Sequence, residues 1–388
     1  MDMLDNSRLR FLVLAAALLA GCGNGSGSTG TGGGGGTPQA AAPTISTSTS
    51  NGAQNGAAIV TLATTTSGAT IYYTLDGSTP TTSSQIYEGP FLVGSSSATT
   101  VNAIAVASGD TNSGVTSKTF AAIASGTLVW SDEFGNATST NAQPNPATWT
   151  YDTGTDCCGN NELETYCAWA STTGPCSTST PNAFIAPGGG LNIVALNPSA
   201  SVYTSGRLKS QGLFSFQYGR IEAKMMLPES QGYWPAFWLL GNSITTVSWP
   251  ACGELDIMEH IDGSNPPPYV GGTPEGHDWI AGSVHGGSSG NEESGTQQYT
   301  TSGFSAAAWH TYGMIWTKGE IQFYVDGTTY ATYKSTDAAW SPTPWPFDSG
   351  PEFIILNLAV GGDWPGNPDS TTVFPGNMQV GYVRIYTN

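Results

Sequence analysis

From residue 127 to residue 388, short strand-like stretches follow one another with Gly, Pro or Asp turns between them. Apolar and polar residues alternate within these stretches, as expected when one face of a strand is buried. The clearest stretches are 190–196, 219–227, 236–241, 253–260, 309–317, 320–327, 353–362 and 378–386. No helical period accompanies them, so the region is predicted to fold as two stacked antiparallel β-sheets.

The charge of the chain limits its partners. Asp and Glu number 28 against 10 Lys and Arg, giving a formal charge of −18. Nucleic acid binding needs clustered basic residues, so nucleic acid is excluded as a partner. Strongly anionic polysaccharides are disfavoured for the same reason, and a neutral ligand fits best.

The first 21 residues are predicted to be an export signal rather than part of the fold. Two arginines precede the apolar run 11–20, which is too short to span a bilayer. The run ends in "LAGC", which resembles the lipobox of bacterial lipoproteins. This resemblance implies cleavage before Cys22 and lipidation of its thiol; the alternative is an ordinary signal peptide. Residues 22–42 are rich in Gly and Ser and are predicted to form a flexible tether.

Two further features precede or interrupt the large β region. Residues 43–122 alternate over short stretches separated by turns, which predicts a small immunoglobulin-like β-sandwich. Within them, 70–91 resembles the chitobiase/β-hexosaminidase C-terminal-type domain. Export favours disulfides, and four cysteines between 157 and 176 predict a stapled loop. Cys252 makes five cysteines besides Cys22, so one thiol stays unpaired, and the pairing cannot be deduced from sequence.

The segment "GELDIMEH" (253–260) places three carboxylates in an apolar strand. Glu254 and Asp256 share one face of a regular strand, whereas Glu259 would point to the other. A bare charge in a sandwich core costs several kcal/mol. A β-bulge at Ile257 and Met258 would return Glu259 to the face of the other two. The segment therefore predicts three carboxylates along one groove.

Crowded carboxylates suit acid–base and nucleophilic chemistry. Like charges on one face raise the pKa of one member, so one carboxyl stays protonated while its neighbour is ionised. Retaining glycosidases use such a pair at a sugar's anomeric carbon. The residues alone leave two alternatives open, a solvated polar face and a calcium site.

The surrounding motifs sharpen this interpretation. "GYWPAFWLLG" (232–241), "WPACGELDIMEH" (249–260) and "FIILNLAVGGDWPG" (353–366) together resemble glycoside hydrolase family 16, and within it the laminarinase-like β-1,3-glucanases. The resemblance runs from residue 128 to the end. It implies a jelly-roll β-sandwich with a concave cleft and a retaining double displacement. Glu254 then matches the nucleophile, Asp256 its helper and Glu259 the acid/base.

The same resemblance implies substrate contacts. "GNNELETY" (159–166) is similar to the family's "GNNELQ" segment, and aromatic and polar positions elsewhere match sugar sites. The implied substrate-binding residues are Asn161, Glu162, Arg207, Trp234, Trp238, His285 and Trp364.

Taken together, the sequence predicts an all-β, monomeric endo-glycosidase in residues 127–388, acting on β-1,3-glucan or mixed β-1,3/1,4-glucan. It would contact a membrane only through the lipid at Cys22, on the outer membrane or cell surface. The alternatives are an agarase or carrageenase of the same subgroup and a non-catalytic glucan-binding surface protein. No cofactor is expected to be required. Relatives hold a structural calcium with an Asp where this chain has Gly381, which argues against that site despite Glu133.

Overall fold

The computed structural model describes residues 37–135, 140–155, 158–262, 279–288, 290–341 and 343–388. The expected signal peptide (1–21), the expected lipidation site Cys22 and most of the expected tether lie outside the described residues. Among the described residues, the helices are three short 3₁₀ segments, Asn242–Thr245, Ala338–Trp340 and Pro346–Asp348. None of these described helices is long and apolar enough to cross a membrane.

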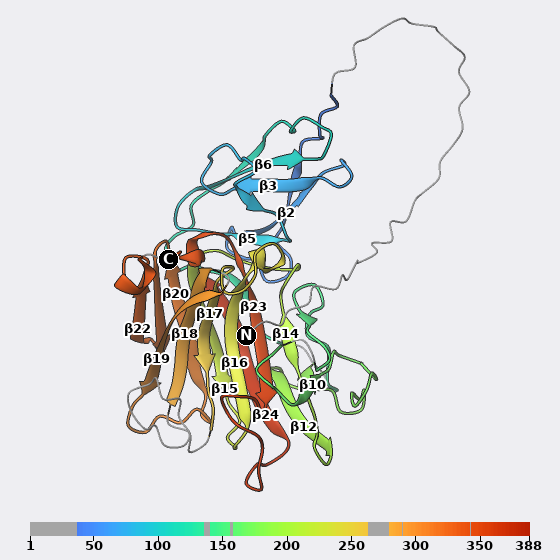
Figure 1. Cartoon of the computed structure of the whole chain (residues 1–388), viewed down its shortest axis with the longest axis vertical. Helices are drawn as coiled ribbons and strands as arrows, with labels where there is room; N and C mark the ends of the chain where they lie inside the picture. Colours follow the sequence, from blue (N-terminus) through green and yellow to red (C-terminus); the bar gives the residue numbers. More distant parts are fainter. Residues whose placement is uncertain (1–36, 136–139, 156–157, 263–278, 289, 342) are drawn as a thin grey trace, which may run out of the picture. The chain divides into compact units, whose positions relative to one another are not determined.

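Residues 44–120 form a small β domain of two sheets (Figure 1). One sheet has the order β1-β2-β5, with β1 (Thr44–Ser48), β2 (Ala58–Ala63) and β5 (Phe91–Val93). The other has the order β4-β3-β6-β7, with β3 (Thr70–Thr74), β4 (Gln85–Ile86), β6 (Thr99–Val106) and β7 (Thr116–Phe120). Tyr73 stacks on Phe91 in its core, at 4.9 Å between ring centroids. Gln39 and Ala40, which we expected in the tether, pair with Thr111, so ordered structure begins before residue 43.

The large β region contains a seven-stranded sheet with the order β19-β18-β17-β16-β23-β14-β9 (Figure 1). Its strands are β9 (Thr150–Tyr151), β14 (Arg207–Lys209), β16 (Tyr233–Gly241), β17 (Glu254–Glu259), β18 (Trp279–Ser288), β19 (Asn291–Thr300) and β23 (Glu352–Val360). All of these pairs are antiparallel. The acidic segment forms β17, with two strands on one side and four on the other, so its backbone is held on both edges.

The second sheet of this region has the order β10-β13-β12-β24-β15-β20-β21-β22, with β11 beside β12 and β8 beside β24. Its strands are β8 (Leu128–Asp132), β10 (Glu164–Tyr166), β11 (Ala183–Ile185), β12 (Leu191–Ser199), β13 (Val202–Ser205), β15 (Gly219–Met226), β20 (His310–Thr317), β21 (Glu320–Val325), β22 (Thr328–Lys334) and β24 (Gly376–Tyr386). Only β10 and β13 are parallel among these pairs.

Strand alternation supplies the core between the two large sheets. Phe237, Leu239, Leu255, Ile354, Leu356 and Leu358 of the seven-stranded sheet join Ile193, Ile221, Met225, Met314, Trp316 and Val383 of the other in one buried cluster. Full burial of such a side chain contributes about 1.5–3 kcal/mol. The residues between them on β16, β17 and β23 face away from this core, and these include the polar positions of the acidic strand.

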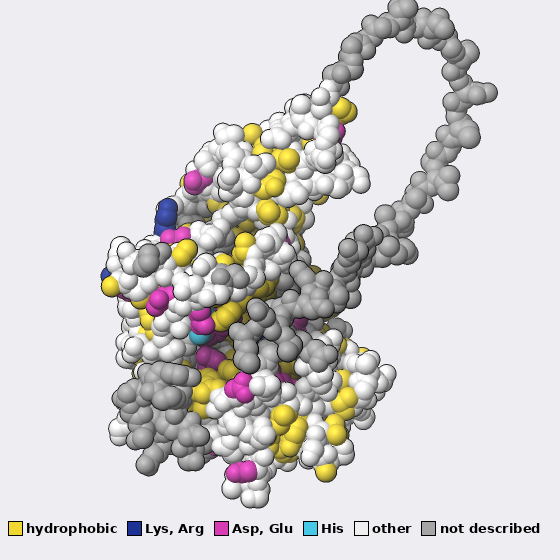
Figure 2. Space-filling model, in the orientation of Figure 1, with side chains coloured by type: hydrophobic (Ala, Val, Ile, Leu, Met, Phe, Trp, Pro, Cys, Tyr) yellow, Lys and Arg dark blue, Asp and Glu magenta, His cyan; other side chains and the backbone are white. Residues whose placement is uncertain are grey.

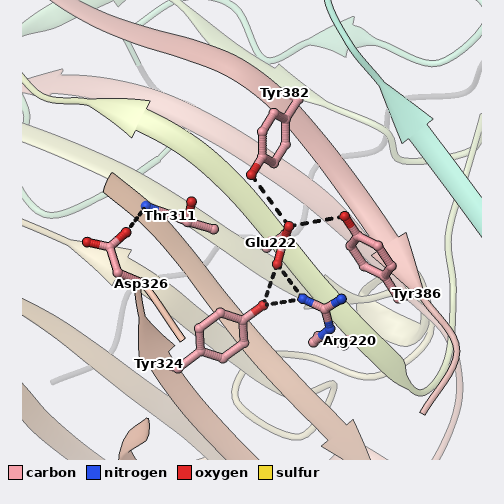
Figure 3. A network of polar contacts seen from close by, with 7 residues as sticks. All are labelled: Arg220, Glu222, Thr311, Tyr324, Asp326, Tyr382 and Tyr386. Carbon is pink, nitrogen blue, oxygen red and sulfur yellow. Dashed lines mark hydrogen bonds and ion pairs between the residues drawn. The ribbon is translucent and has the colours of Figure 1, made fainter. Parts of the chain in front are cut away.

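The outward face of the ten-stranded sheet carries a hydrogen-bonded network (Figure 3). Glu222 is buried and accepts hydrogen bonds from Tyr324 Oη at 2.8 Å and Tyr386 Oη at 3.2 Å. Arg220 Nη1 lies 2.5 Å from Glu222 and stacks over Tyr386. Tyr382 also points to Glu222. This network ties β15, β21 and β24 together on the side opposite the core.

The cysteines of the described residues include the disulfide and the unpaired thiol that the sequence predicted. Cys167 and Cys176 form a disulfide with Cα atoms 5.7 Å apart. Cys158 is also disulfide-bonded, and Cys252 is a buried free thiol. Cys157 lies outside the described residues. A disulfide therefore staples the segment that follows the "GNNELETY" motif, as the spacing predicted.

Candidate active site

A bulge in β17 brings its third carboxylate to the face of the other two. In the register with β16, Trp238 lies opposite Asp256 and Ala236 lies opposite Glu259. Trp238 and Ala236 are two residues apart and share a face, while their partners are three residues apart. One extra residue in β17 therefore restores Glu259 to the face of Glu254 and Asp256. The predicted bulge is confirmed.

His285 on β18 completes this cluster from the neighbouring strand. It pairs with Glu254 in the register, and its Nε2 lies 3.2 Å from Asp256 Oδ2. Its Nδ1 lies 2.7 Å from Glu292 Oε1 on β19. Burial alone would lower the pKa of His285, but the hydrogen bonds to Asp256 and Glu292 raise it well above the usual value. The ring is therefore a cation at neutral pH, held between two carboxylates.

The two outer carboxylates keep their protons to unusually high pH. Burial, and then the charge of Asp256, raises the pKa of Glu254 and of Glu259 to about 8. Glu254 has two cations near it, His285 and Arg207, which both favour its ionised form. Figure 2 shows a histidine among acidic and hydrophobic side chains on the face where β17 and β18 lie in Figure 1. The charge of Glu254 also raises the pKa of Glu259, so the two groups titrate as a coupled pair, and Arg207 favours the charge on Glu254.

Two tryptophans donate to these carboxylates. Trp234 Nε1 donates to Glu259 Oε1 at 2.9 Å. Trp249 hydrogen-bonds to Glu254, and its ring centroid lies 6.2 Å from that of His285. Trp249 is 42% exposed, so part of this side chain is accessible to a ligand.

The floor beside the carboxylates is built from β14, β16 and β23. The Arg207 guanidinium lies 4.8 Å from the centroid of the Trp238 ring. Arg207 Nε lies 3.0 Å from Asp152 Oδ2, which fixes the guanidinium from its other side. Trp238 Nε1 donates to Asn357 Oδ1 at 2.8 Å. A half-buried aromatic ring and a cation are thereby presented together, an arrangement suited to sugar rings and their hydroxyls.

The remaining expected binding residues gather beyond the end of β23. Asn161 Nδ2 donates to the Asp363 carboxylate at 2.9 and 3.1 Å. Glu162 accepts a hydrogen bond from Tyr166 Oη at 3.0 Å. The half-buried Trp364 makes an edge contact with Trp234, at 5.3 Å between centroids. This contact connects the far group of residues to Glu259.

The structure adds residues that the sequence motifs did not single out. Glu292 acts on His285 from across the β18–β19 hairpin, and Asp152 acts on Arg207 from a segment 55 residues earlier in the chain. Asn357 and Tyr166 link the floor to Glu162. Neither acid has a local signal, because strand pairing brings it to its partner. Trp249 could have been found, since it stands five residues before the acidic strand in a motif already matched.

The sequence of the acidic segment 253–260 also leaves open a calcium site. Ligand atoms of Glu254, Asp256 and His285 all lie within 4.8 Å of one another. Both ring nitrogens of His285, however, are engaged by carboxylates, Nε2 by Asp256 and Nδ1 by Glu292. A protonated imidazole has no lone pair for a metal. This arrangement favours an ion-pair cluster over a metal centre.

The calcium site implied by the family resemblance does not fit these residues. Both oxygens of Glu133 face Arg384, with Nε at 2.9 Å and Nη2 at 2.8 Å. Gly381 offers no side-chain oxygen to a cation. The Arg384 guanidinium supplies the positive charge that a cation would bring to Glu133.

Each of the two β regions matches a known protein family. The family profile for glycosyl hydrolases family 16 matches residues 175–384, and that for the chitobiase/beta-hexosaminidase C-terminal domain matches residues 49–118. A beta-glucanase of Rhodothermus marinus is 36% identical over 67% of this chain and 84% of that protein. Glucan endo-1,3-beta-glucosidase A1 of Niallia circulans is 32% identical over 68% of this chain but only 38% of that protein.

A solved structure agrees with these relatives. The catalytic domain of an endo-1,3-beta-glucanase (laminarinase) from Thermotoga petrophila superposes with a TM-score of 0.56 and 34% identity, over 67% of this chain and 97% of that one. The predicted all-β architecture, with a jelly-roll sandwich after a small β domain, is confirmed. The chain belongs to glycoside hydrolase family 16 and is a glycoside hydrolase.

Proposed function

We propose that this chain is a retaining endo-hydrolase of β-1,3-glucan in which Glu254 is the nucleophile and Glu259 the acid/base. The observation that carries the proposal is the bulge, which sets Glu259 on the face of Glu254 and beside the donor Trp234. Without it, one of two groups needed for a double displacement would point into the core.

The reaction follows from these positions. The Glu254 carboxylate attacks the anomeric carbon, the bond to the leaving oxygen breaks, and Glu259 gives that oxygen its proton. Water then attacks the glycosyl–enzyme bond and loses a proton to the Glu259 carboxylate. Glu254 leaves as a carboxylate, and both groups regain their starting states. Two displacements at one carbon give a product with the original anomeric configuration.

The electrostatics distinguish the two carboxyls. The His285 cation favours the ionised form of both carboxyls, whereas the Arg207 cation and the Trp249 donor add to it at Glu254, as a nucleophile requires. Glu259 has the Trp234 donor and no such nearby arginine among its principal neighbours. Asp256, fixed by His285, separates the two and raises the pKa of both. The first proton that the pair loses therefore leaves Glu254, and the proton that remains is on Glu259, where acid catalysis needs it.

The substrate class rests on charge and on relatives. The relatives named above are a beta-glucanase, a glucan endo-1,3-beta-glucosidase and a laminarinase. A chain with 28 acidic and 10 basic residues favours a neutral glucan over sulfated galactans. The "LAGC" sequence and the Gly-rich segment after it support export and lipid anchoring at Cys22 to the outer membrane or cell surface.

A substrate panel with matched variants tests the proposal. Wild-type protein should release reducing ends from laminarin, more slowly from barley glucan, and not from agarose or carrageenan. Glu254→Gln should abolish release, and Glu259→Gln should reduce it by about 10²- to 10⁴-fold. Glu293→Gln, a carboxylate on β19 outside the cluster, is the matched control. Full laminarin hydrolysis by Glu254→Gln would overturn the proposal, and binding without hydrolysis would identify a glucan-binding protein instead.

A further inference from the structure

A second group of acidic residues lies beside the cleft, apart from the β17 carboxylates. Glu162 precedes β10, and Glu164 begins it. Glu164 is only 2% exposed, whereas Glu162 is half-buried. Glu164 Oε2 accepts the Val360 backbone N–H at 2.8 Å, at the end of β23. The catalytic scheme above makes no use of this buried carboxyl.

The other oxygen of Glu164 has no donor among the described residues. Glu164 Oε1 is buried and receives no N–H or O–H. The Glu162 carboxyl lies within hydrogen-bonding reach of Glu164, and so does Tyr166 Oη, whose hydrogen goes to Glu162 Oε2. A hydrogen bond can then join the two carboxyls. Ionised carboxylates are acceptors only, so this hydrogen bond exists only if one of the two carries a proton. Burial, and then the charge of Glu162, raises the pKa of Glu164 to about 8, which places the proton on Glu164.

The pair is connected to the floor of the cleft. Tyr166 Oη donates to Glu162 and accepts from Asn357 Nδ2 at 3.3 Å. Asn357 in turn accepts from Trp238, which lies opposite Asp256. A chain of hydrogen bonds through Tyr166 and Asn357 thereby connects the Glu162–Glu164 pair to Trp238 in the floor of the cleft.

The backbone also fixes this group in place. Gly362 has φ of +114°, and a Cβ there would lie 3.0 Å from Asn160 O and 3.7 Å from Glu162 Cγ. Leu163 N donates to Val360 O at 2.8 Å. The turn that carries Glu162 therefore packs directly on the end of β23. These contacts fix the backbone of Glu162, and neighbouring side chains orient its carboxylate.

Few other charges face Glu164. From its own segment these are Glu162 and Tyr166. β13 supplies Tyr203 as its register partner, and β23 supplies the Val360 N–H. Arg207 on β14 acts on Tyr166 rather than on Glu164 directly. Loss of the Glu164 proton would leave two adjacent anions, and no cation of the described segments lies among the principal charges acting on Glu164.

We propose that Glu164 is a positioning residue, which as a neutral carboxylic acid donates to Glu162 and orients that carboxylate to accept hydroxyl hydrogen bonds from a bound glucan. This role rests on the proposed function. When Glu164 ionises, the hydrogen bond is lost and Glu162 is repelled from its position. Glucan affinity then falls with rising pH, independently of the catalytic acid.

The test measures binding in a background without the titrating catalytic pair. The full chain carrying Glu254→Gln and Glu259→Gln is compared with the same protein carrying Glu164→Gln or Glu164→Leu in addition. Laminarihexaose is titrated calorimetrically between pH 6 and pH 9, and circular dichroism and thermal unfolding verify the fold of each variant. Gln keeps an N–H donor of the same shape at every pH, whereas Leu has none.

The background should lose about tenfold in affinity by pH 9, because one pH unit above a pKa near 8 leaves a tenth of the protein competent. Glu164→Gln should restore the affinity that Glu164→Leu loses at pH 6, and its profile should be flat. A fall of equal size in Glu164→Gln, or equal affinities for the Gln and Leu variants, would overturn this role alone. Absence of binding by the background at every pH would overturn the proposed function with it.

Discussion

The indole Nε1 of Trp234 donates a hydrogen bond to Glu259 Oε1 at 2.9 Å. Trp234 lies on β16, two residues before Ala236, the register partner of Glu259. The contact therefore exists only because the bulge in β17 turns Glu259 to this face. In the proposed function, Trp234 is therefore a regulator of the acid/base group as well as an aromatic surface for a sugar.

Removal of that donor should move the alkaline limb of the pH profile upward. The hydrogen bond favours the ionised form of Glu259, so Trp234→Phe raises the pKa of Glu259 above its present value of about 8. A hydrogen bond to a charged group contributes about 1.5–3 kcal/mol, which corresponds to about one pKa unit or more. The measurement is kcat/KM on laminarin from pH 5 to pH 10. A limb that moves to lower pH would contradict the assignment.

Glu292→Gln should weaken the positive charge next to the nucleophile. Glu292 raises the pKa of His285, so its neutralisation lowers that pKa. Glu254 then loses a stabilising cation over part of the pH range, so its pKa rises. The acid limb of the kcat/KM profile should therefore move upward by about half a pH unit; the shift is small because Glu292 is partly exposed. With only 4 histidines in the chain, the His285 ring is assignable by NMR. Glu293→Gln is the control. An unchanged His285 pKa in Glu292→Gln would contradict the proposed effect of Glu292 on the charge next to Glu254.

The bulge and the three-carboxylate face could be predicted from the sequence, because strand alternation leaves Glu259 on the wrong side unless one residue is added. The aromatic positions Trp234 and Trp238 followed from motifs on the same segment. Glu292 and Asp152 could not be predicted in this way. Each meets its partner through strand or loop packing between segments that carry no shared pattern. Glu164 was visible in the sequence, but its burial and its orphan oxygen were not.

Stability should fall as the pH rises from about 5 to about 8. Burial raises the pKa of Glu164, Glu254 and Glu259 to about 8, from 4.5 for an unperturbed glutamate. Between these values the native state holds protons that the unfolded state has released, so the free energy of unfolding decreases with pH. Burial likewise raises the pKa of Glu352, which is 1% exposed. Denaturant unfolding at pH 5, 6.5 and 8 measures the slope.

Glu352→Gln should make that slope shallower, because Gln stays neutral throughout. Glu293→Gln should leave it unchanged. Stability that increases over this interval would show that the buried carboxyls are ionised in the native state.

Calcium should not stabilise this protein. The Arg384 guanidinium already pairs with both oxygens of Glu133. The midpoint of thermal unfolding should therefore be the same in EDTA and in millimolar CaCl₂. Arg384→Met should cost no more than about 1 kcal/mol, since the pair is partly exposed. An increase of several degrees with CaCl₂ in the wild-type chain would contradict this assignment.

Azide rescue tests the central claim, that Glu254 and Glu259 act from one cleft face as nucleophile and acid/base. Glu254→Gly and Glu259→Gly are each incubated with an aryl β-laminaribioside carrying a good leaving group, with and without azide. The account predicts an α-glycosyl azide from Glu254→Gly, because azide displaces the leaving group once. It predicts a β-glycosyl azide from Glu259→Gly, because azide then attacks a glycosyl bond to Glu254. The same anomer from both variants, or rescue of neither, would contradict it.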